Sequence, residues 1–503
     1  MQPESKKSPY FSALWGDRGE LWTPDGRLPD FSWAGYHGGN APLPSLPRGV
    51  SVRDCGAVGD GEHDDTAAFL RAIEQAQGAI EIPAGRYVIR QILRITRPNV
   101  VLRGEGPEKS VLVCPVHLTD ILPDWGVTTC GQRTSNYSWS GGIVWLQGRP
   151  LSSVLTSITG RQARGARFVE VANAAALSAG QRILIHQRDT AENSLADHLY
   201  TSDAGETHLL MGTTTAHLPC RVVAVAGNRV EIDRPLRFDI DPRWTPEIID
   251  YQPTVTECGV EGLTFEFPET DYAGHFGELG YNAIAMENVS DCWIRNIRIH
   301  NADGGIFAFG TFCTVQDVAF TCARKPDEKS GCHGHHGVYF KGDDNLFSGF
   351  TYGTTFIHDI SVSMGAGNVF SDGKGVDLCF DHHKRAPYEN LFTNIDMGRS
   401  SRPWFCGGGH ALGKHCAGRG TFWNLLGEMP IQRPGKGFGP HSMNLVGIAT
   451  SSTSADAELE ADAESPSIWL EATDGTTVQP ANLHLAQLQK RRASVDGAAE
   501  ATP

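Results

Sequence analysis

The sequence has no long hydrophobic run, either internally or at its start. It contains no stretch of about 18 consecutive apolar residues, the length that a membrane-spanning helix needs. The opening residues, Met1 to Lys7, lack the apolar core of a signal peptide. We therefore expect no membrane partner. We also expect a secreted or periplasmic protein whose leader is absent from this sequence. A cytoplasmic protein is the alternative.

Positive charge is scarce relative to negative charge. The 503 residues include 43 Lys and Arg against 58 Asp and Glu, which gives a formal net charge of −15. A chain this acidic does not bind nucleic acid or an anionic membrane over its whole surface, because like charges repel. We therefore expect no nucleic-acid partner.

Cysteine is present, but not in a metal-binding pattern. The 12 cysteines include no Cys-x-x-Cys pair, which argues against a structural zinc site. Two pairs, Cys322 with Cys332 and Cys406 with Cys416, are each ten residues apart and could close loops in an oxidising compartment. The sequence leaves the redox state of the cysteines open.

The sequence also lacks long stretches of helical periodicity, and it lacks the Leu-x-x-Leu-x-Leu signature of leucine-rich repeats. The sequence has instead a period in the twenties, marked by short apolar segments that follow an asparagine or a cysteine. Short strands, 57 glycines for tight turns and this period are typical of a solenoid. We predict an all-β fold, a right-handed parallel β-helix. The marked segments begin at Cys292, Cys313, Asn345, Asn368, Asn390 and Asn424.

A short helix is predicted just before the first coil. Apolar residues from Phe69 to Ala76 follow the i, i+3, i+4, i+7 spacing of one helical face, and Asp64 or Asp65 can cap the N-terminus. Such a helix would cover the open end of the coil stack, which would otherwise expose unpaired strand edges.

The same region carries a family resemblance. The segments Gly56-Ala-Val-Gly-Asp-Gly61, Asp64-Asp-Thr66 and Ile82-Pro-Ala-Gly-Arg-Tyr-Val88 resemble the opening of the pectate-lyase-like β-helix superfamily. The repeats extend this resemblance over roughly residues 50–445. It implies a protein that acts on polysaccharides, as a lyase, a glycoside hydrolase, an epimerase or a phage depolymerase. It also implies that the opening aspartates shape the cap rather than catalyse.

The extent of the repeats sets the expected domain limits. We expect a β-helix over residues 49–445, interrupted by a small β-rich insertion at about 150–250. Within this insertion, a polar excursion over 189–218 would wall a groove. The flanking parts are an irregular N-terminal arm over 1–48 and a C-terminal extension over 446–503, with an acidic linker over 451–464, a strand over 468–470, a helix over 481–492 and a disordered end.

Eight of the 19 histidines fall in one stretch, residues 333–415. Histidine is the side chain that most readily transfers protons near neutral pH. If Val338 and Phe340 point into the coil, the alternation of a strand places Tyr339 and Lys341 outward together. Later coils would add further histidines at the ~4.8 Å spacing of neighbouring strands. The result would be a linear track suited to an extended sugar chain.

The charges near this track favour an anionic substrate. Basic side chains gather here on an otherwise acidic protein, which would make the groove locally positive. We predict an anionic polysaccharide or oligosaccharide as partner, and we leave the oligomeric state open. The basic residues are Lys341, Lys374, Lys384, Arg385, Arg399, Arg402, Lys414 and Arg419.

We predict a lyase that cleaves a uronate-containing polysaccharide by β-elimination. A base removes the C5 proton once the adjacent carboxylate is neutralised, and an acid protonates the leaving oxygen. The predicted catalytic residues are Lys341, Tyr339, His336, His358 and His383. The predicted substrate-binding residues are His335, Asp381, His382, Arg385, Arg402, His275 and Glu278.

Three other functions stay open. A glycoside hydrolase needs two carboxylates ~5–10 Å apart. In the polygalacturonase branch, which the Gly-His and Asp-Asp elements resemble, the histidine follows the Asp-Asp pair, whereas here the order is reversed. A uronate C5-epimerase would begin with the same proton abstraction as a lyase, and a non-catalytic carbohydrate-binding protein would need fewer titratable groups. Candidate carboxylates are Asp343, Asp344, Asp359, Asp377 and Asp381.

A bound metal stays open as well. Imidazole groups could hold a transition metal if loops bring them together, and they could equally serve proton transfer. The protein would then have either no cofactor or a divalent cation, calcium or zinc. The histidines considered for this role are His333, His335, His336, His382 and His383.

Overall fold

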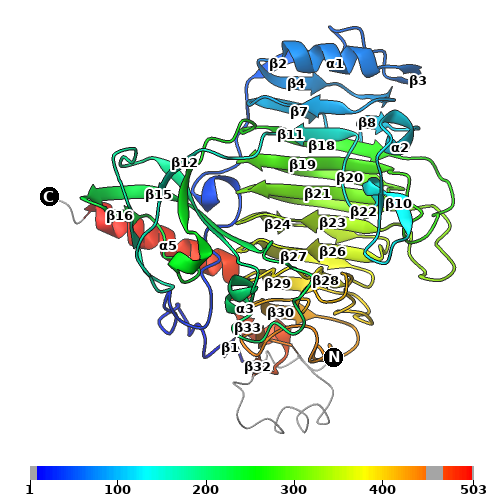
Figure 1. Cartoon of the computed structure of the whole chain (residues 1–503). Helices are drawn as coiled ribbons and strands as arrows, with labels where there is room; N and C mark the ends of the chain where they lie inside the picture. Colours follow the sequence, from blue (N-terminus) through cyan, green and yellow to red (C-terminus); the bar gives the residue numbers. More distant parts are fainter. Residues whose placement is uncertain (1–7, 449–467, 501–503) are drawn as a thin grey trace.

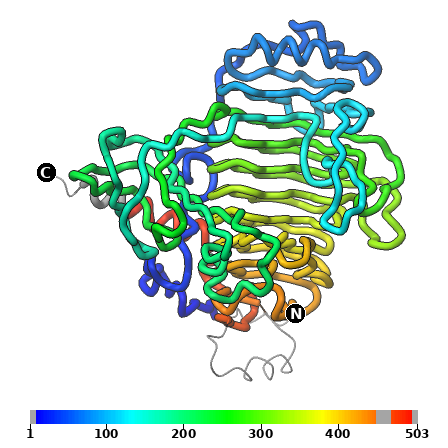
Figure 2. Tube along the Cα trace, in the orientation of Figure 1, coloured from blue at the N-terminus to red at the C-terminus, as the bar shows by residue number. Residues whose placement is uncertain are grey.

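The structure is a computed structural model that describes residues 8–448 and 468–500. Its centre is a stack of parallel strands wound into a right-handed β-helix, which confirms the predicted fold class (Figures 1 and 2). The largest sheet runs in the order β2 (Arg48–Ser51), β4 (Gly78–Ile82), β7 (Val100–Gly104), β18 (Gly259–Glu266), β20 (Trp293–His300), β22 (Thr314–Thr321), β24 (Leu346–Ser348), β27 (Val369–Gly375), β29 (Leu391–Asp396), β30 (Thr421–Leu426), β31 (Asn444–Val446) and β32 (Trp469–Glu471).

A second parallel sheet carries the candidate site. Its order is β6 (Leu93–Ile95), β11 (Val144–Gln147), β19 (Asn282–Ser290), β21 (Gly304–Thr311), β23 (His336–Phe340), β26 (His358–Val362) and β28 (Phe380–His382). Four short strands extend the larger sheet off its main path: β3 (Asp60–Asp64), β5 (Gly85–Val88), β8 (Ser110–Val113) and β25 (Thr351–Tyr352).

A buried asparagine ladder explains the repeat. Asn345 Nδ2 donates to Asn368 Oδ1, and Asn368 Nδ2 donates to Asn390 Oδ1, both at 2.9 Å. Each coil must therefore present an asparagine at the same turn, because a buried amide left without a partner would destabilise the stack. Asn424 lies outside this ladder and donates to Asn394 at 3.2 Å, because strand β30 begins before it.

A column of phenylalanines fills the coil interior beside this ladder. The cross-strand register aligns Phe347, Phe370, Phe392 and Phe422. The rings of Phe370 and Phe392 stack with their centroids 4.5 Å apart, and those of Phe392 and Phe422 lie 5.3 Å apart. Each fully buried ring contributes ~1.5–3 kcal/mol relative to exposure. Apolar stacking and the ladder thus fix the same register.

The predicted capping helix is α1 (Thr66–Gln75), which covers the first coil (Figure 1). Asp64 Oδ1 accepts a hydrogen bond from the backbone nitrogen of Thr66 at 3.0 Å. The Asp65 carboxylate instead accepts from the backbone nitrogens of Val58 and Gly59, at 2.6 and 3.2 Å. The two aspartates therefore shape the cap.

The insertion is a six-stranded antiparallel sheet that projects from the side of the coils (Figure 1). Buried ion pairs fasten it to the turns of the coils: Arg182 lies 2.6 Å from Asp291, and Arg234 lies 2.7 Å from Asp344. Arg237 also pairs with Asp344. Its strands are β12 (Val154–Ser157), β13 (Phe168–Glu170), β14 (Arg182–Arg188), β15 (Thr215–Ala226), β16 (Arg229–Ile232) and β17 (Glu247–Asp250), with helix α3 (Ser194–Leu199) in the polar excursion.

Both ends of the chain cover the outer face of the largest sheet. Trp15 and Phe31 of the arm pack against Trp423 in one hydrophobic cluster, which also contains Leu483 of α5 (Leu483–Glu500). Helix α5 continues beyond Arg492, where the sequence pattern predicts its end. The predicted linker over 451–464 lies outside the described residues. The remaining elements are β1 (Tyr10–Phe11), β9 (Trp125–Val127), β10 (Arg133–Ser135), β33 (Val478–Gln479), α2 (Leu118–Ile121) and the 3₁₀ turns Tyr36–Gly39, Asn136–Ser138, Pro242–Trp244 and Gly475–Thr477.

None of the helices in the described ranges is both long and apolar enough to span a membrane. All 12 cysteines lie within these ranges and are free thiols, so the pairs Cys322/Cys332 and Cys406/Cys416 are not disulfide-bonded.

Candidate active site

The site is built on three neighbouring strands, β23, β26 and β28. Their register places Tyr339 beside Ser361 and Ser361 beside Asp381. Neighbouring strands are ~4.8 Å apart, so the three side chains form a row on one face. Ser361 Oγ donates to Asp381 Oδ2 at 2.8 Å.

Asp381 is the hub of this row and is fully buried. Besides Ser361, it faces Nδ1 of His383 at 2.9 Å and Nδ1 of His358 at 3.4 Å, and it accepts from the backbone nitrogen of Gly407 at 2.8 Å. Burial acts to raise the pKa of Asp381, but the two imidazoles and the hydrogen bonds outweigh it and hold the pKa below its usual range. The carboxylate is therefore ionised.

The two histidines beside Asp381 differ in exposure. His358 is buried, and burial together with neighbouring histidines lowers its pKa to about 3 despite the opposing effect of Asp381, so the ring is neutral. The side chain of His383 is 28% exposed. Because His383 Nδ1 donates to the ionised Asp381, its Nε2 keeps the lone pair and can accept a proton.

His336 and Tyr339 form a stacked pair, with ring centroids 4.9 Å apart. His336 Nδ1 lies 2.9 Å from Ser361 Oγ, whose only proton is used on Asp381, so the histidine donates. Burial lowers the pKa of His336 well below its usual value and raises that of Tyr339. Both side chains are therefore neutral at physiological pH.

Lys341 lies on the same outer face, as the strand alternation predicts. Its Nζ is 4.5 Å from the ring centroids of both Tyr339 and Phe309. Burial, with a contribution from the positive charge of Arg385, lowers the pKa of Lys341 to about 8. Lys341 can therefore exchange a proton near neutral pH, while exposed Arg385 supplies a permanent positive charge at the rim.

A second imidazole–carboxylate pair lies beside the first. Glu278, from the loop before β19, is 3.4 Å from His335 Nδ1 and accepts hydrogen bonds from Ser138 at 2.9 Å and from Tyr272. Burial acts to raise the pKa of Glu278, but His335 and these hydrogen bonds lower it to about 2. Glu278 is thus a permanent carboxylate that orients His335.

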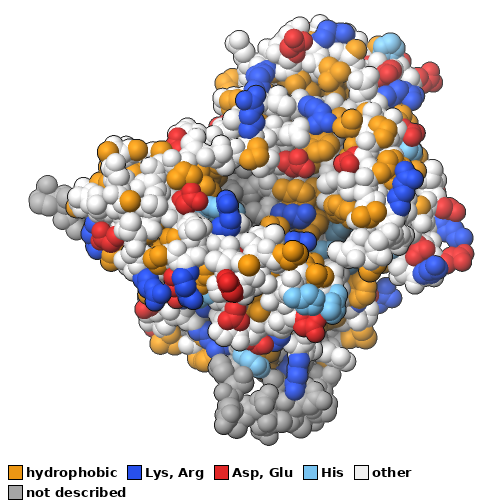
Figure 3. Space-filling model, in the orientation of Figure 1, with side chains coloured by type: hydrophobic (Ala, Val, Ile, Leu, Met, Phe, Trp, Pro, Cys, Tyr) orange, Lys and Arg blue, Asp and Glu red, His pale blue; other side chains and the backbone are white. Residues whose placement is uncertain are grey.

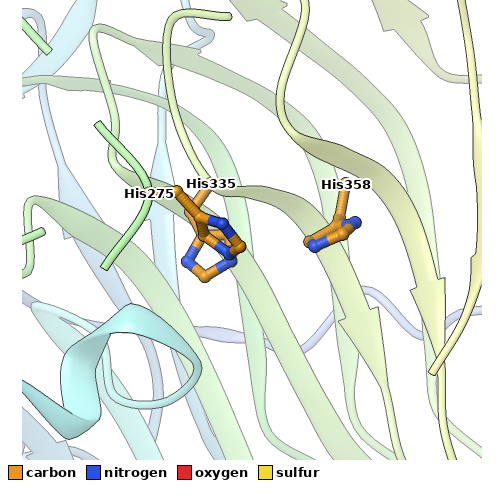
Figure 4. Close-up of side chains that lie close together, drawn as sticks. All are labelled: His275, His335 and His358. Atoms are coloured by element: carbon orange, nitrogen blue, oxygen red, sulfur yellow. The ribbon is translucent and has the colours of Figure 1, made fainter. Parts of the chain in front are cut away.

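His275 approaches from the same loop as Glu278 and is exposed. Its ring stacks on Phe276, with centroids 3.7 Å apart. It also lies 4.6 Å from the ring of His335 and 5.9 Å from that of His358 (Figure 4). Residues far apart in the sequence thus meet at one point.

Two of the predicted substrate-binding residues lie away from the site. His382 points into the coil, where its ring packs 5.1–5.6 Å from three phenylalanines, among them Phe438. Arg402 pairs with buried Asp359 at 2.5 Å and donates to the backbone oxygen of Phe356 at 2.9 Å. His382 belongs to the coil interior, because strand alternation turns it opposite to His383. Arg402 holds the coil together through its ion pair with Asp359.

Four of the five carboxylates considered for hydrolysis pair with groups outside the site, among them Asp343, which lies 3.4 Å from His217. Asp344 is buried between Arg234 and Arg237, which anchor the insertion. Asp359 pairs with Arg402, and Asp377 accepts from Ser401. The fifth, Asp381, and the additional carboxylate Glu278 lie at the site, where imidazole and hydroxyl groups enclose each of them. No open pair is therefore seen among these candidates.

Three residues that contact the site, Ser361, Phe405 and Gly407, were not predicted from the sequence. Ser361 follows Tyr339 by one coil and could have been found by extending the repeat. Gly407 and Phe405 lie in the irregular segment after β29, which carries no periodic signal. The Phe405 ring is stacked against that of His358, with centroids 5.9 Å apart, and is 52% exposed.

A cavity of about 500 Å³ adjoins the site where the insertion faces the coils. It reaches Phe309, the ring on which Lys341 lies. The space-filling view has a hollow between the insertion and the coils, with basic and histidine side chains within it (Figure 3). Further lining residues are Arg149, His186, Arg188, His217, Glu247 and Asp343.

Comparison with known proteins adds a family match at the start of the coils. Residues 49–115 match the model described as rhamnogalacturonase A/epimerase, pectate lyase-like. The plasmin and fibronectin-binding protein A of Streptococcus pneumoniae is 30% identical over 112 residues, which are 20% of this chain and 15% of that protein. The pre-neck appendage protein of Bacillus phage B103 is 39% identical over 64 residues, 13% of this chain and 7% of that protein.

Solved structures are similar over a larger share of the chain, at low identity. The tailspike protein gp49 of Pseudomonas phage LKA1 is 13% identical, with a TM-score of 0.39 over 80% of this chain and 83% of the tailspike. A hyperthermoactive exopolygalacturonase from Thermotoga maritima is 10% identical, with a TM-score of 0.38 over 76% and 72% of the two chains. Residues 49–115 are thus similar to a pectate-lyase-like family, and the parallel coils continue from this matched segment.

Proposed function

We propose that this protein is a polysaccharide lyase that cleaves an acidic, uronate-containing polysaccharide by β-elimination. The observation that carries the proposal is the pair formed by Asp381 and His383, next to Lys341. A buried carboxylate orients a partly exposed imidazole, and a lysine whose pKa is about 8 lies beyond the Tyr339 ring. The matched family description supports a sugar polymer as the substrate.

The two proton transfers of β-elimination can be assigned to these residues. Nε2 of His383 takes the C5 proton, and Asp381 stabilises the imidazolium that forms. The electron pair forms the C4–C5 double bond as the C4–O bond breaks, and protonated Lys341 gives its proton to the leaving oxygen. Arg385 binds the uronate carboxylate and favours the negative charge that develops next to it.

The same geometry disfavours hydrolysis by two carboxylates. An inverting or retaining glycosidase needs two carboxyl groups facing one sugar bond, and one of them must be protonated. Glu278 has a pKa of about 2 and Asp381 is held ionised, so neither can act as the acid. The groups able to move protons are imidazoles and a lysine, which suits proton abstraction from carbon.

The cavity beside the site supports an extended substrate. It continues from Phe309 toward Arg149 and Arg188, so a sugar chain over Lys341 would meet further positive charge. We propose a location outside the cytoplasm, where such polymers occur.

The test is incubation of the purified protein with a panel of uronate polymers while ultraviolet absorbance is followed. A lyase leaves an unsaturated uronate that absorbs, and His383→Ala should abolish the signal. New reducing ends without absorbance would indicate a hydrolase instead. A changed proton spectrum of an uncut polymer would indicate an epimerase, and binding without any chemical change would indicate a non-catalytic protein.

A further inference from the structure

Three histidines converge beside the Asp381–His383 pair. His275 comes from the loop before β19, His335 precedes β23, and His358 begins β26. Each offers a ring nitrogen, and the three nitrogens lie within 4.8 Å of one another (Figure 4). We propose that these three imidazoles bind a first-row divalent transition metal ion, with zinc as the best fit.

The surroundings of the rings are those of metal ligands. Within the described parts of the chain, no hydrogen bond joins these three rings to one another, although they are crowded together. Nδ1 of His335 faces Glu278, and Nδ1 of His358 faces Asp381, each at 3.4 Å. A carboxylate behind a histidine fixes its orientation and leaves the opposite nitrogen to the metal.

A second group of possible ligands fits less well. Asp381 and His383 also lie within 4.8 Å of His358. However, Asp381 Oδ2 already accepts hydrogen bonds from Ser361 and His383, at 2.8 and 2.9 Å. A metal there would have to displace both donors. The three-histidine group has no such competing bonds, and exposed His275 leaves it open to solvent.

The donor atoms decide the class of metal. Imidazole nitrogen suits zinc, cobalt, nickel and copper, whereas calcium takes oxygen ligands. Zinc holds histidine nitrogens at ~2.0–2.1 Å, so binding would draw the rings together, which the exposed His275 loop can accommodate. Three protein ligands leave a fourth position for water or substrate.

The place of this site suggests its role. The ring of His358 lies 5.5 Å from that of His383, the proposed base. A cation here would bind the uronate carboxylate beside the C5 proton and make that proton more acidic. This role rests on the proposed function, whereas metal binding itself does not.

The test uses the full-length protein after removal of metal with a chelator. Zinc is titrated by calorimetry, and cobalt is added in parallel because its visible spectrum reports ligand number. We expect one zinc per chain, and a His275→Ala variant that binds zinc more weakly by at least ~10–100-fold, the loss typical of even a supporting residue. His63→Ala, which removes an exposed histidine from β3, is the matched control.

A second variant distinguishes a loss of metal binding from unfolding of the protein. Glu278→Gln should also weaken zinc binding, and its circular dichroism and melting temperature show whether the coil is intact. The inference is overturned if the chelated wild-type protein binds no zinc, or if His275→Ala and His63→Ala bind it equally. Zinc binding without lyase activity would refute the proposed function alone, and lyase activity in a protein that binds no metal would refute this inference alone.

Discussion

His383 Nδ1 lies 2.9 Å from Asp381 Oδ2, and the histidine is 28% exposed while the carboxylate is fully buried. This relationship gives the two side chains different tasks. The carboxylate sets the tautomer of the ring and stabilises its protonated form, and the ring presents a free nitrogen to the substrate.

Replacing the proposed base should stop catalysis without unfolding the protein. We expect His383→Ala to lower kcat by ~10²–10⁴, the usual loss for a positioned general base. The melting temperature should hardly change, because the side chain is partly exposed. His410→Ala, at a histidine that is 76% exposed, is the control and should retain activity. Wild-type turnover in His383→Ala would place the base elsewhere.

The pH dependence of activity should report Lys341. Its pKa is about 8, so the ammonium form is present below that pH and is lost as the pH rises through it. If Lys341 is the acid, kcat/KM for a uronate polymer should fall above about pH 8. Lys341→Arg keeps its charge at high pH but does not give up its proton, so kcat should fall and the remaining activity should lack this alkaline limb. An unchanged limb in the variant would exclude Lys341 as its source.

Arg402 should matter for stability rather than for substrate binding. Removing one partner of a buried ion pair typically costs ~3–5 kcal/mol, because the other charge is left alone. We therefore expect Arg402→Ala to destabilise the fold by about this amount in urea unfolding, since Asp359 is fully buried. Adding Asp359→Asn should recover part of the loss. A normal stability with a raised KM would return Arg402 to the substrate-binding residues.

The asparagine ladder should contribute measurably to the fold. Asn368 donates to Asn390 Oδ1 and to the backbone oxygen of Gly342, each at 2.9 Å. Its replacement by alanine leaves buried groups unsatisfied, at ~1–3 kcal/mol each. Asn228→Ala, at an exposed turn of the insertion, should change stability by less than ~0.5 kcal/mol. Equal stability of the two variants would argue against the ladder.

The cavity beside the site should bind distal sugars of a long substrate. Arg149 and Arg188 are exposed there and lie away from the proposed proton transfers. We expect Arg188→Ala to raise KM for long oligosaccharides and to leave kcat and the shortest cleavable substrates unaffected. An equal effect on substrates of every length would show that the cavity is not a separate binding region.

The sequence by itself determined the architecture, because a parallel stack is periodic. Each coil meets its neighbours at the same positions, so the asparagines at 345, 368 and 390 had to recur at nearly equal intervals. Strand alternation also assigned Tyr339 and Lys341 to the outer face, where the structure has them. Local chemistry predicted the cap, since α1 needs only its own apolar face and Asp64.

Only the tertiary structure separated His383 from its neighbour His382, which lies among phenylalanines inside the coil. Their directions depend on where strand β28 ends, and the repeat does not fix that point. The tertiary structure also made Asp344 an anchor for the insertion. The sequence did not indicate this role, because the arginines that bind Asp344 lie more than a hundred residues earlier. The loop that carries His275 and Glu278 has no periodic signal, so its approach to His335 was settled by long-range packing alone.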